Sequence, residues 1–199
     1  MSTGSLETGG GGTTRTFGAR LFGALKLDAS VYEEVEHDTT ALGQAATVVL
    51  LASFSQGVAA FEEVGAGGAL ASVVGSFLGW GIGAGIVWVI GVKIMNCTSD
   101  YGELLRTLGF ATAPGILGAL GVLPLGSGEW VLGLLIFALS VVAAVIAVRQ
   151  ALDVSTGRAI VVCIIANLVP VALVLLLTLV LVGMGIGAGE AATSGAMGF

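Results

Sequence analysis

The chain has 199 residues, of which 56% are hydrophobic and only 10% charged, and its mean hydropathy is +1.04. Because an ordinary soluble domain is about 25% charged, this composition excludes a soluble enzyme and a disordered polar chain, and it leaves an integral membrane protein. The net charge is −6. A nucleic-acid partner, which needs a basic patch, is therefore not expected.

The N-terminal part of the chain precedes any long apolar stretch. Residues 1–16 are rich in Gly, Ser and Thr, which predicts a flexible tail. Residues 17–38 are expected to form an amphipathic segment on the cytoplasmic lipid surface; a docking site for a soluble partner is the alternative. The apolar face of this segment comprises Phe17, Leu21, Ala24 and Leu25, with Arg20 and Lys26 elsewhere. Ser30 and Glu33 have capping-box spacing, which predicts a second helical turn beginning at Ser30.

Five stretches reach the roughly 20 apolar residues that a helix needs to cross ~30 Å of hydrocarbon. They cover residues 40–61, 68–94, 104–125, 130–148 and 159–186. The third has the weakest hydropathy, and a re-entrant hairpin is the alternative there. The expected fold class is therefore all-α: an integral membrane bundle of five transmembrane helices preceded by an interfacial amphipathic helix. The membrane domain is expected over residues 39–187, with a tail of small residues over 188–199.

The basic residues indicate how the chain is oriented. All seven Lys and Arg lie before the first span, around the connection after the second, or between the fourth and fifth. The positive-inside rule then predicts a cytoplasmic N-terminus and an external C-terminus. Without the third span, Arg149 and Arg158 would fall on the wrong side, so the charge pattern favours a true crossing there.

Three polar segments resemble a known family. They are VYEEVEHD at residues 31–38, YGELLRTLGFATAP at residues 101–114 and AVRQALDVSTGRA at residues 147–159. In this order and spacing they resemble the Yip1 domain family of multi-span membrane proteins, in its prokaryotic form. The resemblance implies five spans, a cytoplasmic N-terminus and no known catalysis, and with them a place in the cell's inner membrane. Eukaryotic relatives act with small GTPases, but this sequence lacks their long polar N-terminal region, so that role is not carried over.

The side chains that catalysis or metal binding would need are scarce. His37 is the only histidine, so neither a metal centre nor a Ser/His/Asp triad is expected. Cys97 and Cys163 form no CxxC pair and should lie toward the reducing cytoplasmic side, so a disulfide is not expected. We therefore expect no catalytic, cofactor or metal site.

Glycines recur at a spacing that suits helix packing. Gly75, Gly79 and Gly83 follow one another every four residues in the second span, and Gly183 and Gly187 do so at the end of the fifth. Small residues at this spacing let helices approach closely in a membrane. The contact they predict lies either within the monomer or at an interface with a second copy or another subunit.

Two spans that run in the same direction carry prolines at similar depth. Pro114 and Pro170 each free a backbone carbonyl one turn earlier. Together with Thr112 and Asn167, these carbonyls suggest a small polar cavity of the kind that broken helices form in transporters. The alternative is a pair of kinked structural helices.

Opposite charges also fall in two connections on one side of the membrane. Asp100, Glu103 and Arg106 face Arg149, Asp153 and Arg158, and we expect ion pairs between the two groups.

The sequence as a whole favours a non-enzymatic, Yip1-like membrane protein. It would act as an organising or accessory component through contacts of its helices and cytoplasmic loops, as a subunit of a larger membrane complex. The expected partners are the lipid bilayer and either other membrane-protein subunits or further copies of the chain. The alternative is a small-solute or ion permeation protein that uses the Pro114/Pro170 region.

Overall fold

The structure is a computed structural model that describes residues 14–124 and 126–183. The expected C-terminal tail and most of the N-terminal one lie outside these residues. Every regular element within them is helical, which confirms the all-α class. In chain order they are α1 (Phe17–Leu25), α2 (Ala29–His37), η1 (Thr39–Ala41), α3 (Leu42–Ala59), α4 (Phe61–Trp88), η2 (Val89–Ile94), α5 (Tyr101–Ala111), η3 (Ala113–Val122), η4 (Gly126–Gly128), α6 (Glu129–Ala151) and α7 (Thr156–Gly183).

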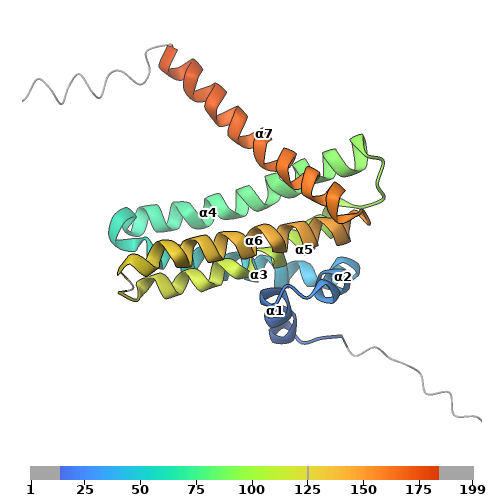
Figure 1. The fold of residues 1–199 in the computed structure, drawn as a ribbon, viewed down its shortest axis with the longest axis horizontal. Coiled ribbons are helices and arrows are strands. Elements are labelled where there is room, and N and C mark those ends of the chain that lie inside the picture. The colour runs from blue at the N-terminus through green and yellow to red at the C-terminus, as the bar shows by residue number, and fades with distance from the viewer. Residues whose placement is uncertain (1–13, 125, 184–199) are drawn as a thin grey trace, which may run out of the picture.

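The five predicted spans are confirmed to within a few residues. The helical stretches long and apolar enough to cross a membrane are Thr39–Ala59, Val64–Ile94, Tyr101–Val122, Glu129–Ala151 and Thr156–Val180. The first four run side by side, and α7 leans away from them (Figure 1). With 28 residues, α7 is about 42 Å long. This exceeds a hydrocarbon core of ~30 Å, and a tilted helix accommodates the excess.

The third span changes its helical geometry halfway along. The α-helix α5 ends at Ala111, and the 3₁₀-helix η3 continues the span, with Pro114 in its first turn. A proline has no N–H to donate, so it suits the start of the new helix. At 1.5 Å per α residue and ~2 Å per 3₁₀ residue, the two pieces together reach about 36 Å. This is enough for a crossing, and the chain does not form the re-entrant hairpin.

A row of glycines brings this 3₁₀-helix against α3. Since a 3₁₀-helix has three residues per turn, Gly115, Gly118 and Gly121 share one face of η3. A Cβ placed on them would lie 3.1 Å from Ala52, 3.3 Å from Gln56 and 3.3 Å from Ala59, respectively. The close contact between η3 and α3 therefore comes from glycines three residues apart.

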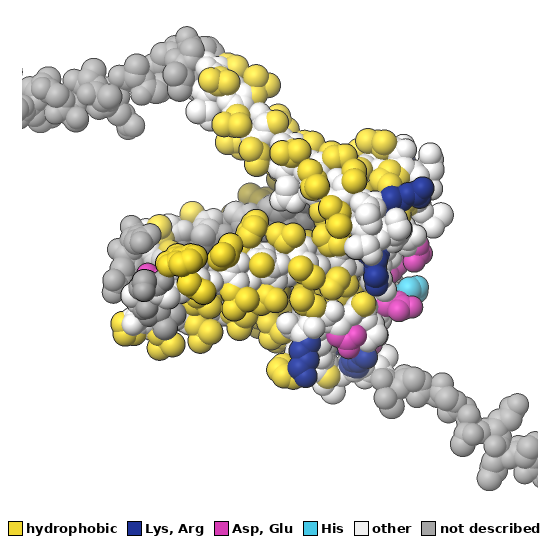
Figure 2. All heavy atoms as spheres, in the orientation of Figure 1, with side chains coloured by type: hydrophobic (Ala, Val, Ile, Leu, Met, Phe, Trp, Pro, Cys, Tyr) yellow, Lys and Arg dark blue, Asp and Glu magenta, His cyan; other side chains and the backbone are white. Residues whose placement is uncertain are grey.

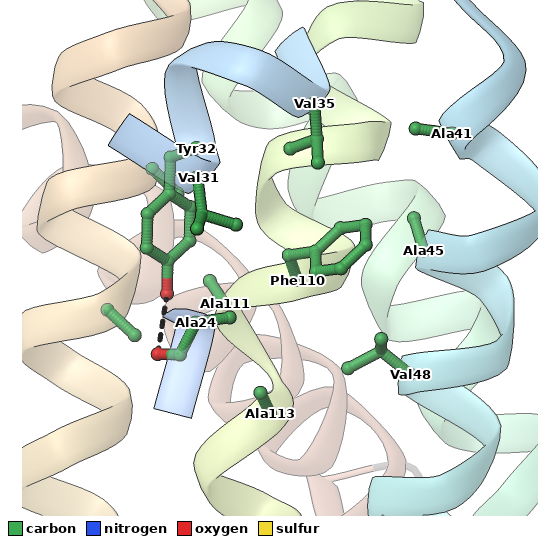
Figure 3. Close-up of a cluster of buried hydrophobic side chains, with 12 residues drawn as sticks. Ala24, Val31, Tyr32, Val35, Ala41, Ala45, Val48, Phe110, Ala111 and Ala113 are labelled. Carbon is green, nitrogen blue, oxygen red and sulfur yellow. Dashed lines mark hydrogen bonds between the residues drawn. The ribbon is translucent and has the colours of Figure 1, made fainter. Parts of the chain in front are cut away.

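The segment over residues 17–38 folds as a helical hairpin packed on one end of the bundle. Asp28 caps α2 with a hydrogen bond from the Ser30 N–H, so α2 begins one residue before the predicted start. Val31, Tyr32 and Val35 face Phe110 of α5 in a common core, and the Tyr32 hydroxyl donates to the Ala24 carbonyl at 3.4 Å (Figure 3).

This packing adds a contact with the bundle to the predicted interfacial helix, and it shows that one detail of the predicted faces of α1 is wrong. The side chain of Arg20, which was assigned away from the apolar face of α1, is 1% exposed. Phe22 instead points outward, at 59% exposed, next to Lys26. The inner face of α1 is therefore organised around a buried charge.

Charged side chains gather at the end of the bundle where the hairpin packs (Figure 2). The long sides are covered by hydrophobic side chains in the same view. This end contains the connections η2–α5 and α6–α7, and the helices that flank them carry Lys93, Arg106, Arg149 and Arg158. The basic residues of alternate segments thus meet at one end, as a chain crossing a membrane five times requires. We call it the basic end.

Candidate functional site

The hairpin is held by a network of polar side chains around Arg20. The Arg20 guanidinium donates to Glu34 Oε1 from Nε and Nη2 at 3.0 and 2.9 Å, and to Asp38 Oδ2 from Nη2 at 2.7 Å. Its Nη1 donates to Gln44 Oε1 at 3.0 Å. The network therefore connects α1 to α2, to the turn that follows α2, and to α3.

A second arginine shares the same carboxylate. The Arg15 backbone N–H donates to Glu34 Oε1 at 2.9 Å, and its Nη1 donates to Glu34 Oε2 at 3.2 Å. Burial opposes ionisation of Glu34, but hydrogen bonds from Arg20 and Arg15 outweigh it, so the pKa of this carboxyl is lowered. Hydrogen bonds from Thr40 and from Arg20 lower the pKa of Asp38. The network is consequently ionised throughout the physiological pH range.

Sequence reasoning missed this network, although a signal for it exists. Phe17, Arg20 and Ala24 lie three and four residues apart, the spacing of one helical face. That spacing puts the arginine on the apolar side, where it must be paired. Its acidic partners lie in the hairpin's second helix and just beyond it.

Arg106 was expected to pair with the connection after the fourth span, and this prediction is wrong. Arg106 is 6% exposed and donates to the main-chain carbonyls of Val35 and Glu36 at the C-terminus of α2. These carbonyls lack helical partners and carry the negative end of the helix dipole, so a guanidinium satisfies them. Arg106 thus ties α2 to the third span.

The other five residues do not form the expected ion pairs either. Asp100 and Glu103 form a capping box at the start of α5, with hydrogen bonds of 2.8 and 2.9 Å. Arg149 donates to the neighbouring Gln150, and Asp153 and Arg158 are exposed. Over residues 14–124 and 126–183, the ion pairs that form all belong to Arg15 and Arg20. Asp100 and Glu103 cap α5 instead of pairing across loops, because the backbone N–H groups at the start of α5 are nearer to them than the basic residues of the other connection.

Glu36 is an unusual carboxyl at this end. Its side chain is 7% exposed, and burial raises its pKa to about 7. His37 acts in the opposite direction, while the carboxylates of Asp153, Glu103 and Glu33 raise the pKa further. We therefore expect the docking of α2 on the bundle to depend on pH near neutrality.

The polar cavity predicted from the two prolines does not form. Thr112 and Pro114 lie inside the bundle, where the Thr112 hydroxyl donates to the Gly109 carbonyl at 2.7 Å. Asn167 and Pro170 lie on the exposed side of α7. The prediction is wrong because equal depth does not bring helices together, and α7 leans away from the bundle (Figure 1).

The glycine row of the second span does not contact another helix either. A Cβ placed at Gly75, Gly79 or Gly83 would meet nothing within 4 Å. Gly79 and Gly83 instead line a lateral cavity of about 640 Å³, which also borders Gln56 and Ser140. Close packing within the monomer is therefore the wrong interpretation of this row, whereas an interface with another chain stays a prediction. Gly183 ends α7, and Gly187 lies outside the described residues.

These features define the class of the molecule: an all-helical protein with five membrane-spanning stretches and a short helical hairpin at its basic end. The Yip1 domain matches residues 29–185, most of the chain, and the chain belongs to this family. The match begins at the first residue of α2, so α1 with Arg20 precedes it. No curated protein and no solved structure shows significant similarity to the chain.

Proposed function

We propose that this Yip1-family protein is a non-enzymatic organising or accessory component of the membrane, which assembles laterally with another transmembrane helix. The observation that carries the proposal is the free second half of α7. Only its first half packs on the bundle, through Ala159, Val162 and Ala166. Residues 167–180 are all exposed.

A polar group on this free half favours a protein neighbour over lipid. Asn167 lies about 16 Å along α7 from Thr156, near the middle of a bilayer. One of its amide N–H groups donates to the Cys163 carbonyl at 2.8 Å. The other N–H and the side-chain carbonyl have no partner among the described residues. Amides of this kind hydrogen-bond between transmembrane helices, typically for ~0.6–2 kcal/mol.

The polar residues of the free half also share one face. Asn167, Val171, Val174 and Thr178 follow one another at intervals of four, three and four residues, the repeat of a helix-packing stripe. Leu176 lies on the opposite face of α7. The stripe thus identifies which side of α7 would meet the neighbouring helix.

The non-enzymatic part of the proposal rests on how the reactive groups are used. The His37 ring lies 2.8 Å from the Glu33 carbonyl through Nδ1 and is exposed. Glu34 and Asp38 bind arginine, while Asp100 and Glu103 cap a helix. These carboxylates serve structure rather than a reaction. The permeation alternative is not retained, because Thr112 and Pro114 lie inside the bundle whereas Asn167 and Pro170 lie on the exposed side of α7.

Photocrosslinking in the native membrane tests the proposal. A benzophenone amino acid placed at Val174, on the stripe, is expected to form a specific adduct with a protein. The same probe at Leu176 is the matched control and is expected to react mainly with lipid. Asn167→Leu should abolish the adduct at position 174 without lowering expression. Lipid adducts alone at both positions would contradict the proposal.

The identity of the adduct partner distinguishes two forms of assembly. A crosslinked product of twice the chain's mass indicates a second copy, and any other mass indicates a different subunit. Asn167→Gln retains an amide and is expected to keep part of the crosslinking.

A further inference from the structure

A second cavity lies between α4 and α7 at their basic ends. Its volume is about 720 Å³, and it opens on the outer surface of the bundle. One side of the cavity is lined by Ile82 and Ile86 of α4 and by Ile90 of η2, and the other side by Ile165 and Val169 of α7. We call it the wedge.

The walls of the wedge offer almost no polar group to an occupant. The hydroxyl of Tyr101, which also lines it, is used because it donates to the Gly81 carbonyl at 2.9 Å. Transmembrane helices associate through small residues and polar contacts, and the wedge has one glycine, Gly85, among bulky aliphatic side chains. A flexible hydrocarbon chain suits such a surface better than a helix does.

The length of the wedge matches one leaflet of a bilayer. Ile82 lies eleven residues from Lys93, and Val169 lies eleven residues from Arg158. Each wall therefore measures about 16 Å from its cation to its inner end. Half of a hydrocarbon core is ~15 Å thick, so an acyl chain seated here would reach the midplane.

Both walls end in a cation at the basic end. On α7, Arg158, Ile165 and Val169 are seven and four residues apart and share one face. On the other wall, the Lys93 ammonium lies 5.0 Å from the ring centroid of Trp88, itself a lining residue. The N-terminus of α7, two residues before Arg158, adds the positive end of a helix dipole.

The backbone of the α4 wall is also unusual at this point. Val89–Ile94 form the π-helical segment η2, and Val89 and Ile94 both line the wedge. Single π-helical turns occur frequently at functional sites, because the wider turn redirects side chains. Here the turn that carries Lys93 is the one that is widened.

We propose that the wedge binds one anionic glycerophospholipid from the leaflet at the basic end. One acyl chain occupies the apolar walls, and the phosphate group lies between Lys93 and Arg158. The site is formed by α4, η2 and α7 of one chain, and it uses the side of α7 away from Asn167. It is therefore separate from the assembly proposed above and does not depend on it.

Fluorescence quenching by brominated lipids tests this site, because Trp88 lies in its wall. A chain with Trp80→Phe and Trp130→Phe retains Trp88 as its single tryptophan, and it is reconstituted in vesicles. Brominated phosphatidylglycerol is expected to quench Trp88 with an apparent affinity about tenfold above that of brominated phosphatidylcholine, since each basic residue near an anionic surface contributes to binding.

Separate variants test the two cations that would bind the phosphate and the apolar wall that would bind the acyl chain. Lys93→Gln combined with Arg158→Gln should abolish the preference for the anionic lipid. Gly85→Leu should displace the acyl chain and lower the quenching of Trp88. A Cβ at Gly85 meets only Tyr101, at 3.8 Å, so the backbone leaves room for a side chain that enters the wedge. Gly75→Leu, on the same helix outside the wedge, is the matched control and should leave quenching unchanged.

Two results would overturn the proposal. Equal quenching by the two lipids, unaffected by Gly85→Leu, would mean that ordinary bulk lipid covers the wedge. Absence of quenching by either lipid would mean that a protein segment fills it. Trp80 donates a hydrogen bond to the Leu105 carbonyl, so its replacement risks misfolding. Native mass spectrometry of the unaltered chain avoids this risk: it should retain one phosphatidylglycerol, and the double Gln variant should retain none.

Discussion

Replacing Arg20 with methionine tests whether the buried network holds the hairpin on the bundle. Methionine keeps much of the apolar length of the side chain but removes four hydrogen bonds, to Glu34, Asp38 and Gln44. We expect the hairpin to open more often while the spanning helices stay folded, because the lost contacts all join α1 to its neighbours.

The free-energy cost of Arg20→Met depends on the hydrogen bonds that Glu34 and Asp38 keep after the arginine is removed. Breaking a buried ion pair by removing one partner typically costs ~3–5 kcal/mol. Here Glu34 keeps the hydrogen bonds from Arg15, and Asp38 keeps those from Thr40. The two carboxylate side chains are also 23% and 21% exposed, so water reaches them. We therefore expect about 2–4 kcal/mol, and Arg20→Lys should cost less because one ammonium still reaches a carboxylate.

Hydrogen exchange in detergent, followed by mass spectrometry, measures this effect locally. Amides of α1 should exchange roughly 30- to 1000-fold faster in Arg20→Met, since 1.4 kcal/mol is a factor of ten. Lys26→Met is the matched control: it removes an exposed cation that caps the C-terminus of the same helix and lies over Phe22. If both variants exchange at the same rate, the apolar core alone holds the hairpin, and the reasoning is refuted.

Three further predictions follow from the packing, the pH response and the topology. Gly118→Leu should lower the melting temperature in detergent more than Gly79→Leu, because overpacking against α3 costs ~1–3 kcal/mol whereas Gly79 faces open space; equal shifts would contradict this. Burial raises the pKa of Glu36 to about 7, so the protonated form favours the docked hairpin. The hairpin's protection from hydrogen exchange should therefore fall as the pH rises from 4.5 to 7, by at most ~3 kcal/mol. Glu36→Gln should make this protection nearly independent of pH. In a chain without native cysteines, a cysteine at Gly128 should react with an impermeant reagent in intact cells, and one at Ser155 only after lysis; the reverse order would exclude a cytoplasmic basic end.

The spans could be predicted from sequence because their signal is local and cumulative. Each needs only enough consecutive apolar residues, and the order of charges on alternate segments favoured the third crossing independently. The weak hydropathy of the third span left a re-entrant hairpin open as an alternative, although the segment does cross. Its glycines, threonines and prolines weaken the hydropathy, yet Gly115, Gly118 and Gly121 are the residues that pack against α3.

Helix contacts could not be predicted with the same security, because spacing identifies a face but not its neighbour. The glycines at 75, 79 and 83 have the α-helical repeat but border a cavity. The glycines at 115, 118 and 121 have a repeat of three, which fits a 3₁₀-helix, and they make the close contact. Pro114, just before that row, is the local signal that the helical repeat changes there.

The ion pairs required tertiary information for another reason. Charges in two loops on one side of a membrane are near each other only on average, and a backbone carbonyl or amide close by competes for each of them. Arg106 reaches the C-terminal carbonyls of α2 because the hairpin folds back onto α5, and no local sequence pattern predicts this fold. Asp100, in contrast, had its partner Glu103 three residues away, and a capping box was readable from the sequence.

The cations of the basic end divide into two groups with different physical roles. Arg15, Arg20 and Arg106 bind acidic side chains or main-chain carbonyls of the hairpin, so their charges stabilise the fold. Lys93 and Arg158 are exposed and form no ion pair within the described ranges, so their charge remains available to lipid headgroups. Removing a cation of the first group should therefore loosen the hairpin at any lipid composition. Removing one of the second should matter mainly when anionic lipid is present, because within the described residues these cations pair with no carboxylate, and Lys93 lies only over the ring of Trp88.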